Sequence, residues 1–158
     1  GAEALYREAL EARRETLGDR HPNTLTSINN LGSLLEAKGD LDGAEALYRE
    51  ALEARRETLG DRHPDTLSSI NNLGLLLKAK GDLDGAEALF REALEARRET
   101  LGDRHPNTLT SINNLGMLLK KKGDLNGAEA LYREALEARR ETLGDRHPNT
   151  LTSINNLG

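Results

Sequence analysis

Apolar residues recur at intervals of three and four along most of the chain, in two alternating kinds of segment. In the first kind, which spans Pro22 to Lys38, the apolar positions are Leu25, Ile28, Leu31, Leu34 and Leu35. In the second kind, from about Leu41 to Leu59, the inward positions are Ala44, Leu47, Tyr48, Ala51 and Leu52. This spacing places each set on one face of an α-helix. The pattern therefore predicts a pair of amphipathic helices joined by a tight turn.

The residues at the predicted helix ends support these boundaries. Pro22 suits a first helical turn, where its missing N–H has no partner to lose. Gly39 suits a left-handed stop after the first helix. The Asp40 carboxylate can accept backbone N–H groups at the start of the second helix, which we expect to end at Gly60.

The helix pair is repeated along the chain with a period of 42 residues. The segment GAEALYREALEARRETLGDRHPNTLTSINNLG recurs almost unchanged from Gly1, Gly43, Gly85 and Gly127. It contains no alternating strand pattern, which excludes a β-propeller of similar period. Neighbouring units must stack, because one unit cannot bury the apolar faces of both its helices. We predict an all-α fold, an α-solenoid of antiparallel helix pairs.

We expect residues 1–158 to form a single repeat array. The chain opens inside a second helix and closes after about eleven residues of a first helix, so both termini fall within a unit. Neither end carries a distinct polar cap, although arrays normally need one for solubility. We therefore expect the terminal helices to expose apolar faces that stack head to tail on neighbouring molecules.

The segment NNLGSLLEAKGDLDGAEALYREAL, which begins at Asn29, resembles a tetratricopeptide repeat. The positions that match this motif are Ile28, Leu31, Gly32 and Leu35 in the first helix and Ala44, Tyr48 and Ala51 in the second. The small residues stand where two helices must approach closely, and Tyr48 fills the space beside them. The repeat length and the motif LGDRHP are similar to the subclass found in kinesin light chains. The resemblance implies a right-handed superhelix whose first helices line a concave surface.

Composition narrows the classes of function. The chain has no cysteine, which excludes a disulfide scaffold, a thiolate metal site and a thiol nucleophile. Its net charge of -5 argues against nucleic-acid binding, which favours a basic face. No apolar run approaches the ~18 residues of a membrane span, and we expect no signal peptide. We expect neither nucleic acid nor membrane as a partner, and cytoplasmic placement is the default expectation.

The histidines recur once per unit in the motif DRHP, as His21, His63, His105 and His147. Equivalent residues of adjacent units lie at least one helix-packing distance apart, about 8–10 Å, whereas two ligands of one metal lie within roughly 4 Å. We therefore interpret the histidines as loop or capping residues. No P-loop, GxGxxG, GxSxG or HExxH pattern occurs. We expect no catalytic, metal-binding or cofactor-binding residues, and hence no enzyme.

Arginine pairs near the ends of the second helices raise the question of phosphate binding. The pairs are Arg13–Arg14, Arg55–Arg56 and Arg97–Arg98. Glutamates such as Glu53 and Glu57 lie near each pair. This arrangement favours a solvated, salt-bridged helix face over a phosphate site.

A pair of asparagines stands in the middle of every first helix, although asparagine has poor helix propensity. In tetratricopeptide arrays these positions match ones that face the groove. An amide offers both a donor and an acceptor, so a ladder of amides can hydrogen-bond the backbone of an extended peptide. The alternatives are simple outward polar positions and bridges between adjacent helices. The asparagines are Asn29, Asn30, Asn71, Asn72, Asn113, Asn114, Asn155 and Asn156.

Three positions that follow the asparagines differ between the repeats. They are occupied by Ser33, Leu75 and Met117; by Glu36, Lys78 and Lys120; and by Ala37, Ala79 and Lys121. A recognition groove requires constant positions that bind the ligand backbone, here the asparagines. It also requires variable positions that select the ligand side chains. Drift on an exposed face explains the same pattern. If the groove is real, Lys78, Lys120 and Lys121 favour an acidic ligand toward the C-terminal half.

We interpret the chain as a non-enzymatic scaffold that binds a protein or an extended peptide on its first-helix surface. The alternative is a structural solenoid that associates with itself through its terminal helices, including a duplicated or consensus-designed array with no dedicated ligand. Apolar end-stacking is expected to persist at high salt, whereas binding of an acidic ligand is expected to weaken.

Overall fold

The structure is a computed structural model that describes residues 1–144 and 146–157. All regular secondary structure in this part of the chain is helical, which confirms the predicted all-α fold. The even-numbered helices are the predicted first helices and the odd-numbered ones are the second helices. In chain order they are α1 (Ala2–Leu17), α2 (Pro22–Ala37), α3 (Leu41–Leu59), α4 (Pro64–Lys80), α5 (Leu83–Leu101), α6 (Pro106–Lys122), α7 (Leu125–Leu143) and α8 (Pro148–Leu157).

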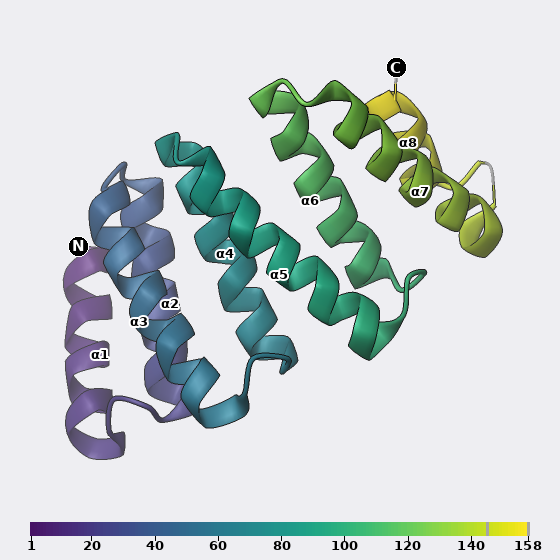
Figure 1. Ribbon diagram of the computed structural model, residues 1–158. Coiled ribbons are helices and arrows are strands. Elements are labelled where there is room, and N and C mark those ends of the chain that lie inside the picture. The colour runs from purple at the N-terminus through teal and green to yellow at the C-terminus, as the bar shows by residue number, and fades with distance from the viewer. Residues whose placement is uncertain (145, 158) are drawn as a thin grey trace. The chain divides into compact units, whose positions relative to one another are not determined.

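The helices form two compact units, Gly1–Asp82 and Leu83–Gly158. In the first unit, α1 packs on α2, α2 on α3, and α3 on α4 (Figure 1). In the second unit the same order holds, with α5 on α6, α6 on α7, and α7 on α8 (Figure 1). Packing between consecutive helices is the arrangement of an α-solenoid. The continuity of all units in a single array remains a prediction.

The helix ends follow the residues that predicted them. α3 begins at Leu41 and ends at Leu59, and the Asp40 carboxylate accepts a hydrogen bond from Gly43 N at 2.9 Å. Gly39 has a φ of 89°, in the left-handed region that glycine adopts without strain. α2 ends at Ala37, one residue before the predicted boundary, whereas α4 and α6 extend as far as the sequence pattern indicates.

The apolar faces form the core between neighbouring helices. Ile28, Ala44 and Ala51 are fully buried, as the helical spacing predicts. Leu34 and Leu47 were also expected in the core, but both are only half-buried. None of the helices in the described ranges combines the length and the hydropathy needed to cross a membrane.

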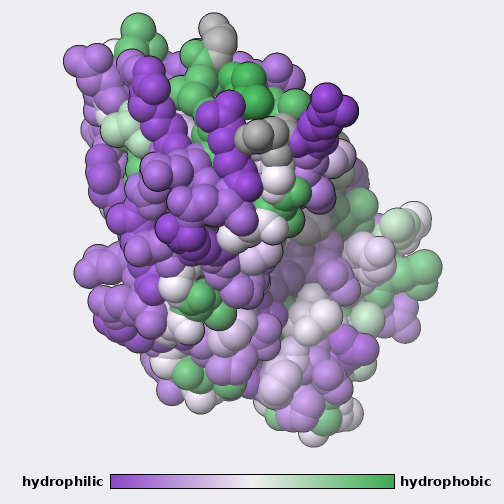
Figure 2. Space-filling view, turned by 90° about the vertical axis from the view of Figure 1, so that its right-hand side faces the viewer, coloured by the Kyte–Doolittle hydropathy of each residue, from purple (hydrophilic) through white to green (hydrophobic). Residues whose placement is uncertain are grey.

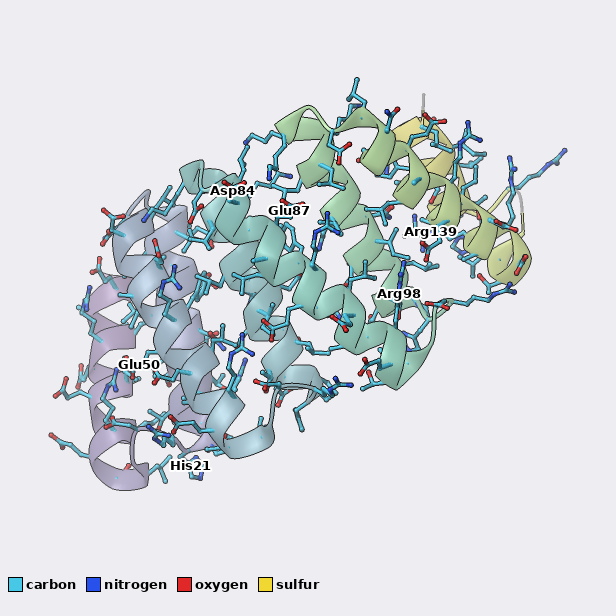
Figure 3. The ribbon with its side chains drawn as sticks, in the orientation of Figure 1. His21, Glu50, Asp84, Glu87, Arg98 and Arg139 are labelled. Atoms are coloured by element: carbon cyan, nitrogen blue, oxygen red, sulfur yellow. The ribbon has the colours of Figure 1, made fainter. Side chains whose placement is uncertain are left out.

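All four histidines lie at the start of a first helix, where the motif DRHP places them. The Nδ1 atom of His63 accepts a hydrogen bond from Asp65 N at 3.0 Å, directly before Pro64 begins α4. His21 accepts in the same way from Asn23 N at 3.1 Å, and it lies at the turn between α1 and α2 (Figure 3). The predicted capping role is confirmed. Within residues 1–144 and 146–157, no group of three or more metal-ligating side chains is placed to hold a metal ion.

The arginine pairs divide into two roles. The second arginine of each pair forms ion pairs, as predicted. Arg14 Nη1 lies 2.6 Å from the Glu50 carboxylate of α3, and Arg98 Nη2 lies 2.7 Å from the Glu134 carboxylate of α7 (Figure 3). These pairs connect consecutive second helices within each unit.

The first arginine of each predicted pair is half-buried like the second, but it also donates hydrogen bonds to the start of the next first helix, which the prediction did not include. Arg97 Nη1 donates to Ser111 Oγ at 2.8 Å and to the Asn107 carbonyl at 3.1 Å. Arg139 is only 7% exposed and donates to Ser153 Oγ at 2.7 Å (Figure 3). Burial lowers the pKa of both guanidinium groups. The stem of the arginine packs inward because its head group has acceptors at the start of the next first helix.

Lysines near the ends of the first helices form a second set of ion pairs. Lys122 Nζ of α6 lies 2.6 Å from Asp84 and 2.7 Å from Glu87, both in the first turns of α5 (Figure 3). Lys80 of α4 pairs with Asp42 and Glu45 of α3 in the same way. These ion pairs thus tie α4 to α3 and α6 to α5.

Candidate peptide-binding site

Each of α2, α4 and α6 presents one outward-facing stripe of side chains. After the first two residues of α2, the exposed positions are Thr26, Asn30, Ser33 and Ala37, and their spacing of four, three and four keeps them on one helix face. The equivalent residues of α4 are also exposed, and those of α6 are exposed except for half-buried Asn114. We call these residues the exposed stripe; they are Thr26, Asn30, Ser33 and Ala37 in α2, Ser68, Asn72, Leu75 and Ala79 in α4, and Thr110, Asn114, Met117 and Lys121 in α6.

The asparagine pairs lie on this stripe and at its border. The second asparagine of each pair belongs to the stripe, whereas the first is half-buried beside it, as in Asn29, Asn71 and Asn113. In α8, Asn155 is exposed and Asn156 is half-buried. The backbone of each helix therefore brings its asparagines next to the variable positions of the same repeat.

The variable positions carry different chemistry in each repeat. Leu75 and Met117 expose 41% and 46% of their surface, a large fraction for apolar side chains, whereas Ser33 offers a hydroxyl at the same position. Beside the stripe, Glu36 and Lys78 are half-buried and Lys120 is exposed. The side chains at these positions are thus acidic and hydroxylic in α2 and apolar and basic in α6.

In the first repeat pair, formed by α2 and α3, the side chains at two variable positions, Ser33 and Glu36, form hydrogen bonds within the protein. The Tyr48 hydroxyl of α3 donates to Glu36 Oε2 at 2.9 Å and lies 3.1 Å from Ser33 Oγ. A phenol has one proton, so the serine hydroxyl must donate to the tyrosine oxygen. Burial and the nearby Glu36 carboxylate raise the pKa of Tyr48, and the Ser33 hydrogen bond opposes this shift.

In the last repeat pair, the equivalent tyrosine has lost both of these contacts. Tyr132 of α7 is 4% exposed, and its first-helix neighbours in the repeat are Met117 and Lys120 in place of Ser33 and Glu36. In the described part of the chain, the Tyr132 hydroxyl makes no hydrogen bond. Burial raises the pKa of Tyr132, so its hydroxyl stays protonated at neutral pH.

Tyr132 lines a surface cavity of about 270 Å³ between α6, α7 and α8. The cavity brings together Lys120 and Asn156, two of the predicted site residues that lie on different helices. Leu125 and Leu157 contribute apolar surface, and Glu129 lies at the cavity with its carboxylate 2.7 Å from Arg133.

The lysines at the end of α6 differ in their availability. Lys122 is engaged with Asp84 and Glu87, and these carboxylates raise the pKa of its ammonium group. Neither Lys120 nor Lys121 pairs with a carboxylate within the described residues. The positive charge available to a ligand at the end of α6 therefore lies on Lys120 and Lys121, two positions that differ between the repeats.

Tyr132 is the repeat equivalent of Tyr48, which the helical spacing predicts in the core, and it is not among the predicted site residues. The residue is indeed buried, but it also lines the cavity. The signal was present in the sequence, because an unchanged tyrosine faces a first helix in which its serine and glutamate partners have been replaced.

The tetratricopeptide repeat profile matches residues 1–57, 28–99, 65–141 and 112–158. The chain therefore belongs to the tetratricopeptide repeat family, as its motif indicated. Members of this family are generally protein-interaction scaffolds, bind proteins or peptides, and are typically not enzymes. A search of curated proteins returned no match.

Solved structures place the chain near the kinesin light chain-like type. It is similar to BtubC (BKLC) from P. vanneervenii, with 28% identity over 99% of this chain, 62% of that chain and a TM-score of 0.84. It is also similar to a putative kinesin light chain from Podosopora anserina with nearly identical TPR-like repeats, with 26% identity over 99% of this chain, 74% of that chain and a TM-score of 0.89. The N-terminal domain of STI-1 from C. elegans shares the fold alone, with 18% identity, 85% and 94% coverage of the two chains and a TM-score of 0.61. The chain spans about 62% of the length of BtubC.

Proposed function

We propose that the chain binds an extended protein segment along the exposed stripes of its first helices. The observation that carries this proposal is the position of Asn30, which lies on the same helix face as Ser33, and the equivalent placement in α4 and α6. The asparagine amides bind the ligand backbone, because an amide both donates and accepts hydrogen bonds. The side chains at the variable positions select among ligand sequences.

The test is a peptide-array screen followed by affinity measurements on variants of the 158-residue chain. We expect Asn30→Ala, Asn72→Ala and Asn114→Ala together to weaken every bound peptide by at least about tenfold, because each lost hydrogen bond contributes about 1 kcal/mol. Alanine favours the helix, so the fold is retained. Leu75→Ala and Met117→Ala are expected to change which peptides bind.

The matched control places neutral amides on the second helices. Ala46→Gln, Ala88→Gln and Ala130→Gln alter exposed second-helix positions with a good helix former. This triple variant is expected to bind all selected peptides with unchanged affinity. Equal loss of binding in the control and the asparagine variant, or no loss in either, contradicts the proposal.

We also propose that the ligand is acidic where it contacts the C-terminal half. Support comes from Lys78, Lys120 and Lys121, which carry positive charge at the variable positions. Replacing these three lysines by glutamine is expected to reduce binding of acidic peptides, and rising salt is expected to have the same effect. Unchanged binding of an acidic peptide library to this triple variant contradicts an acidic ligand.

Self-association is the second candidate function. Tyr6 of α1 is 43% exposed, whereas the equivalent Tyr48 is 3% exposed. Ile154 of α8 is 36% exposed, whereas the equivalent Ile28 is fully buried. Figure 2 faces the α7 and α8 side and shows apolar patches there within a largely hydrophilic surface. In the inner repeats, side chains at these positions pack against a neighbouring helix. The α1 face of one molecule is therefore complementary to the α8 face of another.

Light scattering across a concentration series tests this second candidate. Head-to-tail association predicts a mass that rises with concentration, persists at high salt and returns to that of a monomer in Tyr6→Glu. A monomer at every concentration contradicts it and leaves peptide binding as the function.

A further inference from the structure

The geometry points to a carboxylate-binding subsite at the cavity between α6, α7 and α8, formed by Tyr132, Lys120 and Asn156. We assign to it an acidic side chain of an extended peptide. This inference rests on the proposed peptide-binding function and names the chemistry recognised at one place in it.

Three hydrogen-bond donors of different kinds line this cavity. Tyr132 offers a phenolic proton, Lys120 an ammonium group and Asn156 an amide. Tyr132 as a whole residue is only 4% exposed, and its hydroxyl has no hydrogen-bond partner within the described residues. Because this hydroxyl makes no hydrogen bond within the described residues, its proton is available to a ligand acceptor. A carboxylate accepts from all three donors and balances the lysine charge.

The first repeat pair shows which acceptor the tyrosine takes when one is available. There the Tyr48 hydroxyl donates to the Glu36 carboxylate at 2.9 Å. The residue equivalent to Glu36 in the last pair is Lys120, which carries the opposite charge and cannot accept. The protein's own carboxylate is thus replaced by a cation, and a ligand carboxylate takes its position between the lysine and the tyrosine.

The other groups at the cavity are consistent with this occupant. Glu129 is the one acidic side chain that lines it, and its charge is balanced by Arg133 at 2.7 Å. Leu125 and Leu157 give apolar contact to the stem of the ligand side chain. Asn113 and Asn114 lie one turn before Met117 on α6, so the backbone of the peptide continues along the helix rather than ending at the cavity.

The test uses three capped probe peptides and NMR titration of the isotope-labelled chain. The first is Ac-Gly-Ser-Glu-Ser-Gly-NH2, the second carries Gln in place of Glu, and the third is the Gln peptide with a free C-terminal carboxylate. We expect the Glu peptide to bind about tenfold more tightly than the capped Gln peptide, with shifts centred on Lys120, Tyr132 and Asn156. Equal binding of the two capped peptides, or binding of the free C-terminus alone, overturns the assignment.

Variants separate this subsite from the rest of the groove. Lys120→Gln is expected to weaken the Glu peptide about tenfold and Tyr132→Phe about fivefold, and neither is expected to affect the capped Gln peptide. Tyr132→Phe keeps the buried ring, and Tyr48→Phe is the matched control, expected to change affinity by less than about twofold. If Tyr48→Phe weakens the Glu peptide as much as Tyr132→Phe, the subsite is wrong. If Asn30→Ala, Asn72→Ala and Asn114→Ala abolish binding while Lys120→Gln does not, the proposed function stands and the subsite falls.

Discussion

Gly32 and Tyr48 are in direct contact, and the contact requires glycine. A Cβ atom at Gly32 would lie 2.6 Å from Tyr48 Cε1, closer than real carbon atoms approach. The same relationship recurs between Gly116 and Tyr132, again at 2.6 Å. One edge of the tyrosine ring therefore packs against the first helix, and in the first repeat pair the Tyr48 hydroxyl reaches Ser33 and Glu36.

Substitution of Gly32 by alanine is expected to destabilise the protein by about 1–2 kcal/mol. The added methyl group clashes with the Tyr48 ring, at a cost of roughly 1–3 kcal/mol, and the gain in helix propensity offsets about 1 kcal/mol of this. Urea unfolding measures the effect. Tyr48→Leu is expected to relieve the clash, so the double variant should lose less stability than the sum of the single variants. A Gly32→Ala protein more stable than wild type contradicts this packing.

The buried arginine contacts predict an unequal effect of two neighbouring hydroxyls on α6. Ser111→Ala removes the acceptor that lies 2.8 Å from Arg97 Nη1 and is expected to cost about 1–2 kcal/mol, because a half-buried cation loses a hydrogen bond. Thr110→Ala removes an exposed hydroxyl that bonds only to the Pro106 carbonyl at 3.1 Å. Its effect is expected to stay within about 0.5 kcal/mol. Equal losses in denaturant unfolding would show that the arginine contact contributes no stability.

The histidine caps predict which replacements the motif DRHP tolerates. His63→Ala leaves Asp65 N without its acceptor and is expected to lower the free energy of unfolding by about 1 kcal/mol. His63→Asn supplies another side-chain acceptor at the same position and is expected to retain most of the wild-type stability. The comparison is made by thermal unfolding at neutral pH. Equal stability of the Ala and Asn variants argues against capping by His63.

Much of the fold could be predicted because the helical period and the end residues act locally. Asp40, Gly39 and the histidines define helix ends within a few residues of themselves, and the structure confirms their roles. The buried contact between Arg13 and Ser27 could not be predicted, because it joins residues on two helices that look polar in the sequence. The half-buried state of Leu34 was missed for a related reason, since helix periodicity defines a face but not what covers it.

The candidate site could be predicted only in part from the sequence, for the same physical reason. Comparison of repeats identified Lys120 and Asn156, since sequence differences and asparagines are visible without a structure. The role of Tyr132 depends on the contact of its hydroxyl with residues on another helix, as seen for Tyr48 with Glu36. Such contacts depend on packing, which the periodic pattern does not specify.

The ion pairs between α5 and α6 predict a pH-dependent contribution of Lys122 to stability. The hydrogen bond from Lys122 is the largest cause that lowers the pKa of Glu87, and the hydrogen bond from Arg91 is the next. In the same way, the hydrogen bond from Lys80 lowers the pKa of Glu45. A carboxylate with a lowered pKa binds fewer protons in the folded state than in the unfolded state. The stabilisation is therefore present at neutral pH and is lost as the pH falls from about 4.5 through the lower folded-state pKa.

Lys122→Met is consequently expected to lower the thermal midpoint at pH 7 by a few degrees, and this effect should shrink as the pH falls below about 4.5 through the lowered folded-state pKa of Glu87. Lys121→Met is the matched control, because it removes the same charge from the neighbouring position without breaking an ion pair within the described residues. Its thermal midpoint should follow that of the wild type across the pH range. High salt should narrow the difference between the two variants at pH 7, since exposed ion pairs are screened. A Lys122→Met protein whose deficit persists unchanged at pH 3 would show that the lysine contributes through packing of its stem and not through its charge.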